Sequence, residues 1–189
     1  MYKKYLLPGS LLLGSALISA CSPVVTRPAY VDSSYEPAIL SYASKEGPVY
    51  TEVIGSPFAG EAGQVDRVIT EALKEAQFSG RQLDFTTQRP EDYRSPYRVV
   101  LLFNPAPNAN AAKICATPEQ PQNEGIPGEV MVMVAFCNGD TRVSSTAGYA
   151  SPATTADAPA FGQLIRQVAL DIFPSKSIQR RSDPADFES

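Results

Sequence analysis

Two segments of the chain have the spacing of apolar residues that is typical of an amphipathic helix. The first covers 61–77, where one stripe contains Val65, Val68, Ile69, Ala72, Leu73 and Ala76. The second runs from Asp157 to Pro174, with a stripe made of Phe161, Leu164, Ile165, Val168 and Ile172. Asp157 can cap this second helix, and Pro159 fits its first turn. A shorter helix is expected over 36–45.

Other segments have the patterns of β-strands. The segment 49–54 is rich in β-branched and aromatic residues, and 82–87 fits a short edge strand. The apolar run 98–104 predicts a central strand that is covered on both faces. The segment 129–137 alternates, with Val130, Val132, Val134 and Phe136 on one face and Met131, Met133, Ala135 and Cys137 on the other.

The dipeptide Asn138-Gly139 follows this alternating segment. Both residues tolerate a positive φ, so the pair predicts a type I′ hairpin. The return strand over 141–147 is polar enough to lie at an edge of the sheet. The residues 105–128 are rich in Pro, Asn, Gln and Glu, and they predict a long loop.

This order of elements predicts an α/β fold. It is a two-layer sandwich, in which a mixed four- to five-stranded sheet carries two amphipathic helices on one face. The predicted domain covers 48–174. Before it, 21–47 reads as a tether with one possible short helix, and after it the charged tail 175–189 is expected to be disordered.

The N-terminus has the layout of a secretory signal. Lys3 and Lys4 precede an apolar stretch over 5–18, which Pro8 and Gly9 interrupt. The stretch is short for a membrane-spanning helix, so an uncleaved N-terminal membrane anchor is the less favoured interpretation.

The residues Ile18-Ser19-Ala20-Cys21 resemble the lipobox of bacterial lipoproteins. The resemblance implies that 1–20 is a lipoprotein signal peptide and that Cys21 carries the lipid. Two or three acyl chains suffice for stable membrane anchoring. The alternative is an ordinary cleavage site beside an unrelated Cys. Ser22, rather than Asp, follows the Cys, which in this family implies the outer membrane, with the domain on its periplasmic face, rather than the inner membrane.

Composition narrows the classes of function. The chain of 189 residues has a formal charge of −4, contains no His, and is 43% hydrophobic. That apolar share supports a folded core, whereas the acidic balance argues against nucleic-acid binding. Double-stranded RNA-binding domains share the order helix, three strands, helix, but the charge and the export signal count against that function. The lack of His removes the commonest general base and metal ligand.

The two remaining cysteines, Cys115 and Cys137, form an even pair in an oxidising compartment. Such a pair predicts a disulfide, which the chain-entropy model credits with roughly 3 kcal/mol. Two buried free thiols are the main alternative. A metal site is disfavoured because their spacing is not that of a CxxC motif and no His is present.

Three exposed polar residues are speculative binding candidates. Asn104 ends the buried strand 98–104, at the kind of strand end where α/β proteins often bind ligands, although a strand-ending turn is the simpler interpretation. Asp140 lies in the hairpin and fits an ordinary turn residue. Arg166 on the last helix is suited to bind a partner carboxylate or to face water. The doublet Glu91-Asp92 lacks the rigid separation that a pair of catalytic carboxylates needs.

Several segments resemble a group of uncharacterised proteobacterial lipoproteins: GSPF after the first strand, RVVLLFNP, AFCNGD and LIRQVALDIFP. The resemblance spans 49–174 and implies no activity, cofactor or metal. We expect a non-enzymatic, lipid-anchored envelope protein that acts as a periplasmic scaffold or accessory subunit for another envelope protein, with 105–128 as its contact loop. The main alternative is a small-molecule or glycan-binding module near Asn104. An enzyme using carboxylate or Ser–Lys chemistry ranks third.

Overall fold

The computed structural model describes residues 23–76 and 83–175. Its sheet has the strand order β1-β7-β6-β5-β3-β4, and β2 also pairs with β7. The strands are β1 (Val24–Thr26), β2 (Tyr30–Val31), β3 (Val49–Ile54), β4 (Phe85–Thr86), β5 (Tyr97–Phe103), β6 (Val130–Asn138) and β7 (Thr141–Ala150). The helices are α1 (Ile39–Ala43), α2 (Ala62–Glu75) and α3 (Pro159–Ile172). The predicted signal peptide, Cys21 and the predicted disordered tail from 176 onward lie outside the described residues.

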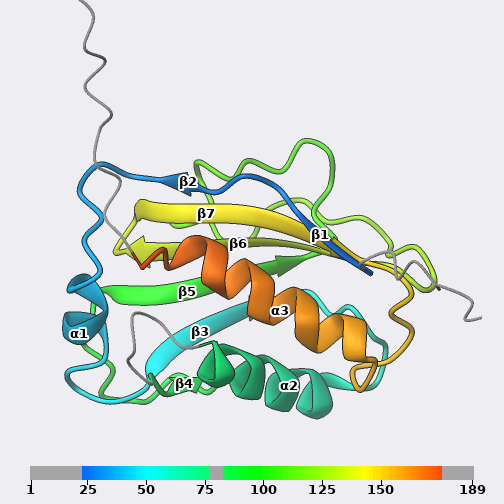
Figure 1. Cartoon of the computed structure of the whole chain (residues 1–189), viewed down its shortest axis with the longest axis horizontal. Coiled ribbons are helices and arrows are strands. Elements are labelled where there is room, and N and C mark those ends of the chain that lie inside the picture. Colours follow the sequence, from blue (N-terminus) through cyan, green and yellow to red (C-terminus); the bar gives the residue numbers. More distant parts are fainter. Residues whose placement is uncertain (1–22, 77–82, 176–189) are drawn as a thin grey trace, which may run out of the picture.

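The two-layer α/β fold is confirmed. The sheet is mixed, because β3 pairs in parallel with β4 and β5 while the other pairs are antiparallel. The helices α2 and α3 lie on the same face of the sheet (Figure 1). The described part of the chain has seven strands, rather than four or five, because two short strands come from the N-terminal segment.

The central strand β5 is covered on both faces, as its apolar run predicts. Val99, Leu101 and Phe103 pack beneath the helices in the larger core. Val100 and Leu102 face the other way, into a smaller cluster with Ile114, Cys115, Ala135 and Cys137. The second cover is therefore the segment 104–129, which connects β5 to β6 and is called the outer loop below.

Both helical stripes are buried as predicted, except that Val68 is only half-buried. The predicted cap by Asp157 is wrong. The cap position of α3 is Ala158, without a side-chain hydrogen bond, and Pro159 begins the helix. The Asp157 carboxylate instead accepts hydrogen bonds from Gln64 and Arg67 of α2. The packing of α2 against α3 offers Asp157 donors that the sequence around α3 does not reveal.

The predicted tether is wrong at 24–26 and 30–31, because these residues join the sheet as β1 and β2. Val25 pairs with Tyr149 of β7, and Tyr30 pairs with Ser145. Tyr35 is buried, and its hydroxyl donates to the carbonyl of Pro174 at 3.0 Å. Burial raises the pKa of Tyr35 to about 12. The N-terminal segment is thus fixed to the domain from β1 as far as Tyr35.

The edge position predicted for the return strand is also wrong, because β1 and β2 cover the outer side of β7. Three of its hydroxyl-bearing residues, Ser144, Ser145 and Thr146, are buried, and two of them donate to backbone carbonyls. Ser144 donates to the carbonyl of Ile172 at 2.6 Å, and Thr146 donates to that of Arg27 at 2.7 Å. Because backbone carbonyls accept these hydrogen bonds, a polar strand is stable inside the sheet.

The hairpin between β6 and β7 is confirmed, but its turn type is not I′. Asn138 pairs with Thr141, so the two central residues are Gly139 and Asp140. Only Gly139 has a positive φ, of 56°, whereas a type I′ turn needs one at both central positions. A positive φ at the first central residue alone is the pattern of a type II′ turn.

We expect Gly148→Ala to destabilise the domain, because helix α3 lies very close to β7 at this point. A Cβ at Gly148 would lie 2.6 Å from Cδ1 of Leu164 and 2.8 Å from Cγ1 of Val168. Overpacking of this kind costs about 1–3 kcal/mol. The control is Gly63→Ala on α2, where a Cβ meets nothing within 4 Å. This control is expected to raise the free energy of unfolding by about 0.5–1 kcal/mol. Equal stability of the two variants in urea unfolding would contradict the close packing.

Candidate functional site

The outer loop has a defined shape without being a helix or a strand. Its two ends run side by side, since Ala106 N–H donates to the carbonyl of Pro121 at 2.9 Å and Asn123 N–H donates to that of Asn104 at 2.8 Å. Between these ends, Ile114 and Cys115 are fully buried against the sheet. The outer loop is therefore a packed part of the domain.

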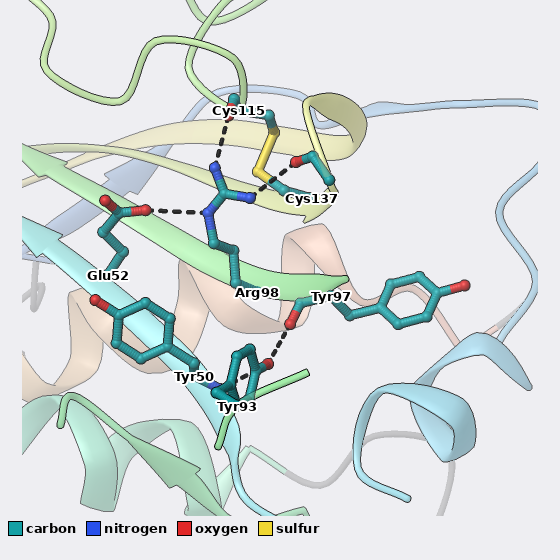
Figure 2. Close-up of polar contacts among 8 residues, drawn as sticks. Tyr50, Glu52, Tyr93, Tyr97, Arg98, Cys115 and Cys137 are labelled. Carbon is teal, nitrogen blue, oxygen red and sulfur yellow. Dashed lines mark hydrogen bonds and ion pairs between the residues drawn. A yellow bond between two sulfur atoms is a disulfide. The ribbon is translucent and has the colours of Figure 1, made fainter. Parts of the chain in front are cut away.

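The predicted disulfide between Cys115 and Cys137 is present and joins the outer loop to β6. Beside it lies Arg98, which is directly opposite Cys137 in the β5–β6 ladder. The Arg98 guanidinium donates to the Cys115 carbonyl at 2.6 Å, to the Gly139 carbonyl at 2.8 Å and to the Glu52 carboxylate at 3.0 Å (Figure 2). These four residues, Arg98, Glu52, Cys115 and Gly139, are called the Arg98 junction.

The Arg98 junction is a structural feature rather than an anion-binding site. Each guanidinium nitrogen already donates to an acceptor of the protein, and the Arg98 side chain is only 18% exposed. The junction holds the outer loop, the β6–β7 turn and β3 together. Sequence analysis missed it, although one signal was available: a charge opening the strongly apolar run 98–104.

A second polar contact fixes the loop before β5. The hydroxyl of Tyr93 donates to the Tyr97 carbonyl and accepts a hydrogen bond from Tyr50 N–H at 3.2 Å (Figure 2). The rings of Tyr50 and Tyr93 also meet edge to face, with centroids 5.7 Å apart. Burial, and then the charge of Glu52, raise the pKa of Tyr50. Both hydrogen bonds of the Tyr93 hydroxyl are to backbone groups of the same chain, which favours a structural role for Tyr93.

A large groove lies on the outer face of the sheet, between the outer loop and strands β1, β7 and β6. Its volume is about 520 Å³, within the range of ligand sites. Val25, Tyr149, Met131, Met133 and Ala109 give it a largely apolar lining, and Arg27 and Asn123 supply polar groups. The groove fits an apolar or amphipathic occupant better than a sugar.

A second hollow of about 490 Å³ lies where β3 and β5 end. Its lining includes Asn104, Ser56 and Thr154, together with two carboxylates. Both carboxylates are engaged, because Glu61 accepts from Ala156 N–H at 2.9 Å and Glu129 accepts from the Tyr149 hydroxyl at 3.0 Å. The hollow offers hydrogen-bonding groups but no nucleophile beside a base.

The three candidate residues do not form one site. Asn104 follows β5 and has a φ of 48°, which supports the strand-ending turn. Asp140 is exposed in the hairpin that contacts the other end of β5, so a strand length of roughly 20 Å separates the two. Arg166 lies on α3 and forms an ion pair with Glu75 of α2 at 3.0 Å.

None of the helices in the described part of the chain is long and apolar enough to span a membrane. No group of three or more His, Cys, Asp or Glu side chains within 23–76 and 83–175 is arranged to hold a metal ion.

Comparison with known proteins identifies no family for the chain. No family model and no curated protein matches it. Among solved structures, the chain is similar to a PelC dodecamer from Paraburkholderia phytofirmans, with a TM-score of 0.39 and 10% sequence identity. The alignment covers 79% of this chain and 97% of that one. A similarity at this level carries no argument about function.

Replacing Arg98 by Met is expected to lower the free energy of unfolding by about 1–3 kcal/mol, because two backbone carbonyls and one carboxylate lose their charged donor. Hydrogen exchange in 105–128 is expected to accelerate in the same variant. The matched control is Arg94→Met, which removes an exposed guanidinium four residues away and is expected to change stability by about 0.5 kcal/mol or less. If the two variants exchange and unfold alike, the Arg98 junction does not hold the outer loop.

Proposed function

We propose that this protein is a lipid-anchored component of the cell envelope that acts as a periplasmic scaffold or accessory subunit and binds another envelope protein through its outer loop. The anchor is the lipid on Cys21, and the favoured location is the periplasmic face of the outer membrane. The observation that carries the proposal is the fixed conformation of the outer loop, which is tied down by the disulfide and the Arg98 junction.

A loop that is ordered before binding is well suited to recognise a partner. Binding residues concentrate on loops that a rigid scaffold positions. Each side chain that is already fixed saves about 0.5–1.5 kcal/mol of ordering cost on association. In the outer loop, Ile114 and Cys115 supply the buried attachment, while every residue from Pro121 to Pro127 is exposed.

The exposed part of the outer loop has a net negative charge, because it carries two exposed carboxylates and one exposed ammonium group, that of Lys113. Glu119 and Glu124 are both exposed, and neither takes part in a salt bridge among the described residues. Complementary charge speeds association and selects partners. The proposed partner surface therefore carries Lys, Arg or other hydrogen-bond donors.

The alternative function is a small-molecule or glycan-binding module, and the hollow beside Asn104 favours it. That hollow has a suitable volume and polar groups from Asn104, Ser56 and Thr154. It is open to solvent, and its two carboxylates already bond to the chain itself. A substitution at Asn104 separates the two functions, because it alters the hollow without changing the charge of the outer loop.

Anchoring is tested by Cys21→Ala, which removes the sulfur atom proposed to carry the lipid thioether. The variant is expected to lose its firm attachment to the membrane fraction or to stay unprocessed, whereas Cys115→Ala retains anchoring. Cell fractionation and the mass of the N-terminal peptide measure the outcome. Normal processing of Cys21→Ala, with undiminished membrane attachment, would refute the anchor.

Partner binding is tested by the double charge reversal Glu119→Lys with Glu124→Lys. Crosslinking in intact cells, followed by mass spectrometry, is expected to show several-fold less of the captured envelope partner, because like charges then face each other. The matched control, Glu91→Lys with Asp92→Lys, makes the same change of charge on another exposed loop and is expected to leave the capture unchanged.

Two results would count against the contact surface. The first is equal capture by the outer-loop variant and its control. The second is unchanged partner capture by the outer-loop variant, together with loss of the protein's cellular activity in Asn104→Ala. That combination would support the small-molecule or glycan-binding alternative.

A further inference from the structure

One end of the sheet exposes a continuous row of apolar side chains. Val25 pairs with Tyr149, and Tyr149 pairs with Met131, so the three lie side by side across β1, β7 and β6 on the outer face. Ile126 extends the row, because it lines the same small hollow as Met131. These four residues are called the apolar strip.

The apolar strip is strongly exposed for residues of this kind. The exposed fraction is 63% for Val25, 60% for Ile126 and 41% for Met131. Single exposed apolar residues need no explanation, but a contiguous group beside a groove marks an interaction surface. No described segment of the chain covers it.

The strip lies close to the point where the N-terminal segment joins the domain. The Pro23 carbonyl accepts a hydrogen bond from Ser151 N–H at 3.0 Å, which fixes the chain just before β1. A chain spans at most about 3.6 Å per residue, so the Cα of Cys21 lies within about 15 Å of that of Val25. Figure 1 shows that β1 begins at the end of the sheet where β3 and β5 finish.

We propose that the apolar strip lies on the lipid bilayer to which Cys21 is attached, with Val25, Met131 and Ile126 in the interfacial region. The proposal rests on the lipid anchor of the proposed function. Because the strip begins within about 15 Å of the anchored residue, the bilayer is present at a very high effective concentration. Apolar side chains gain free energy when they leave water for such an interface.

The polar groups around the strip suit a shallow position. Arg27 is exposed and lines the groove next to Val25, where its guanidinium can meet a lipid phosphate. The Tyr149 hydroxyl is bonded to Glu129, so the strip's own aromatic residue buries no unpaired polar group on contact. Interfacial contacts reach only about 5–10 Å into the headgroup boundary, which leaves the exposed carboxylate of Glu124 in water.

This contact sets the orientation of the domain. The end of the sheet that carries Asn104 faces the membrane, and the hairpin with Asp140 points away from it. The Asn104 hollow opens at the membrane side. Glu124 of the outer loop lines the same small hollow as Ile126 and Met131, so the acidic part of the loop lies beside the strip, where it can meet a partner in the same membrane.

The test uses the fact that the chain contains no Trp. Single tryptophans are introduced as Val25→Trp, Met131→Trp and Ile126→Trp into the full, membrane-derived protein. The control is Tyr42→Trp on α1, at the opposite end of the domain, where the native side chain is 68% exposed. Each protein is reconstituted into phosphatidylethanolamine–phosphatidylglycerol vesicles, with and without brominated acyl chains.

The strip tryptophans are expected to shift their emission to the blue and to lose most of it in brominated vesicles, while Tyr42→Trp is not quenched. Equal quenching at all positions would overturn the proposal. The proposal would also be overturned if aqueous iodide still quenched the fluorescence of the strip tryptophans. That result is expected if the strip binds a protein and not the lipid.

The mass of the N-terminal peptide, measured on the same samples, separates the two proposals. A lipid-modified Cys21 with unquenched strip tryptophans refutes the membrane-facing strip and leaves the anchor standing. An unmodified Cys21 refutes the anchor. If Cys21 is unmodified, quenching confined to the strip tryptophans still supports the membrane contact. Absence of that quenching refutes the membrane contact as well.

Discussion

The contacts made by the Arg98 guanidinium organise the outer face of this domain. Arg98 on β5 lies opposite Cys137 on β6, so the charged hydrogen bond to the Cys115 carbonyl and the disulfide to Cys115 act at nearly the same point. The same guanidinium reaches Glu52 on β3 and the turn at Gly139. Arg98 and the disulfide therefore join three neighbouring strands and the outer loop at one point. The shape of the groove beside the loop depends on these contacts.

These contacts are needed because the two hydrophobic clusters, one on each face of the sheet, are unequal in size. The helices cover one face with a large apolar cluster, whereas the outer loop contributes only a few buried side chains, chiefly Ile114 and Cys115. Burial of so little apolar surface offsets only part of the entropy lost in ordering a loop of this length. A covalent bond and charge-assisted hydrogen bonds supply the remaining stabilisation, and they leave the rest of the loop free to face outward.

The two longer helices were predicted from periodic apolar stripes, and the strands β3, β5 and β6 from runs or alternation of apolar and β-branched residues. The even pair of cysteines predicted the disulfide. Sequence patterns missed β1 and β2, which are too short to show a period and are separated by Pro28. Without those strands, β7 appeared to be an edge. Arg98 escaped notice because its acceptors are two backbone carbonyls and one distant carboxylate. The sequence pattern predicted three separate candidates, Asn104, Asp140 and Arg166. It does not show how far apart they lie in space, because that distance depends on the length of the strands and on which layer each residue belongs to.

The pairing of β1 constrains the order in which the domain is completed. Val24 pairs with Ala150 and Thr26 pairs with Gly148. The first strand of the described chain therefore cannot pair until the last strand, β7, is available. Because the chain is synthesised from its N-terminus, β1 has no partner until nearly the whole domain has been made. Pairing of β1 with β7 closes a very large loop, so it is expected late in folding. The outer side of β7 therefore stays unpaired until β1 and β2 close the sheet.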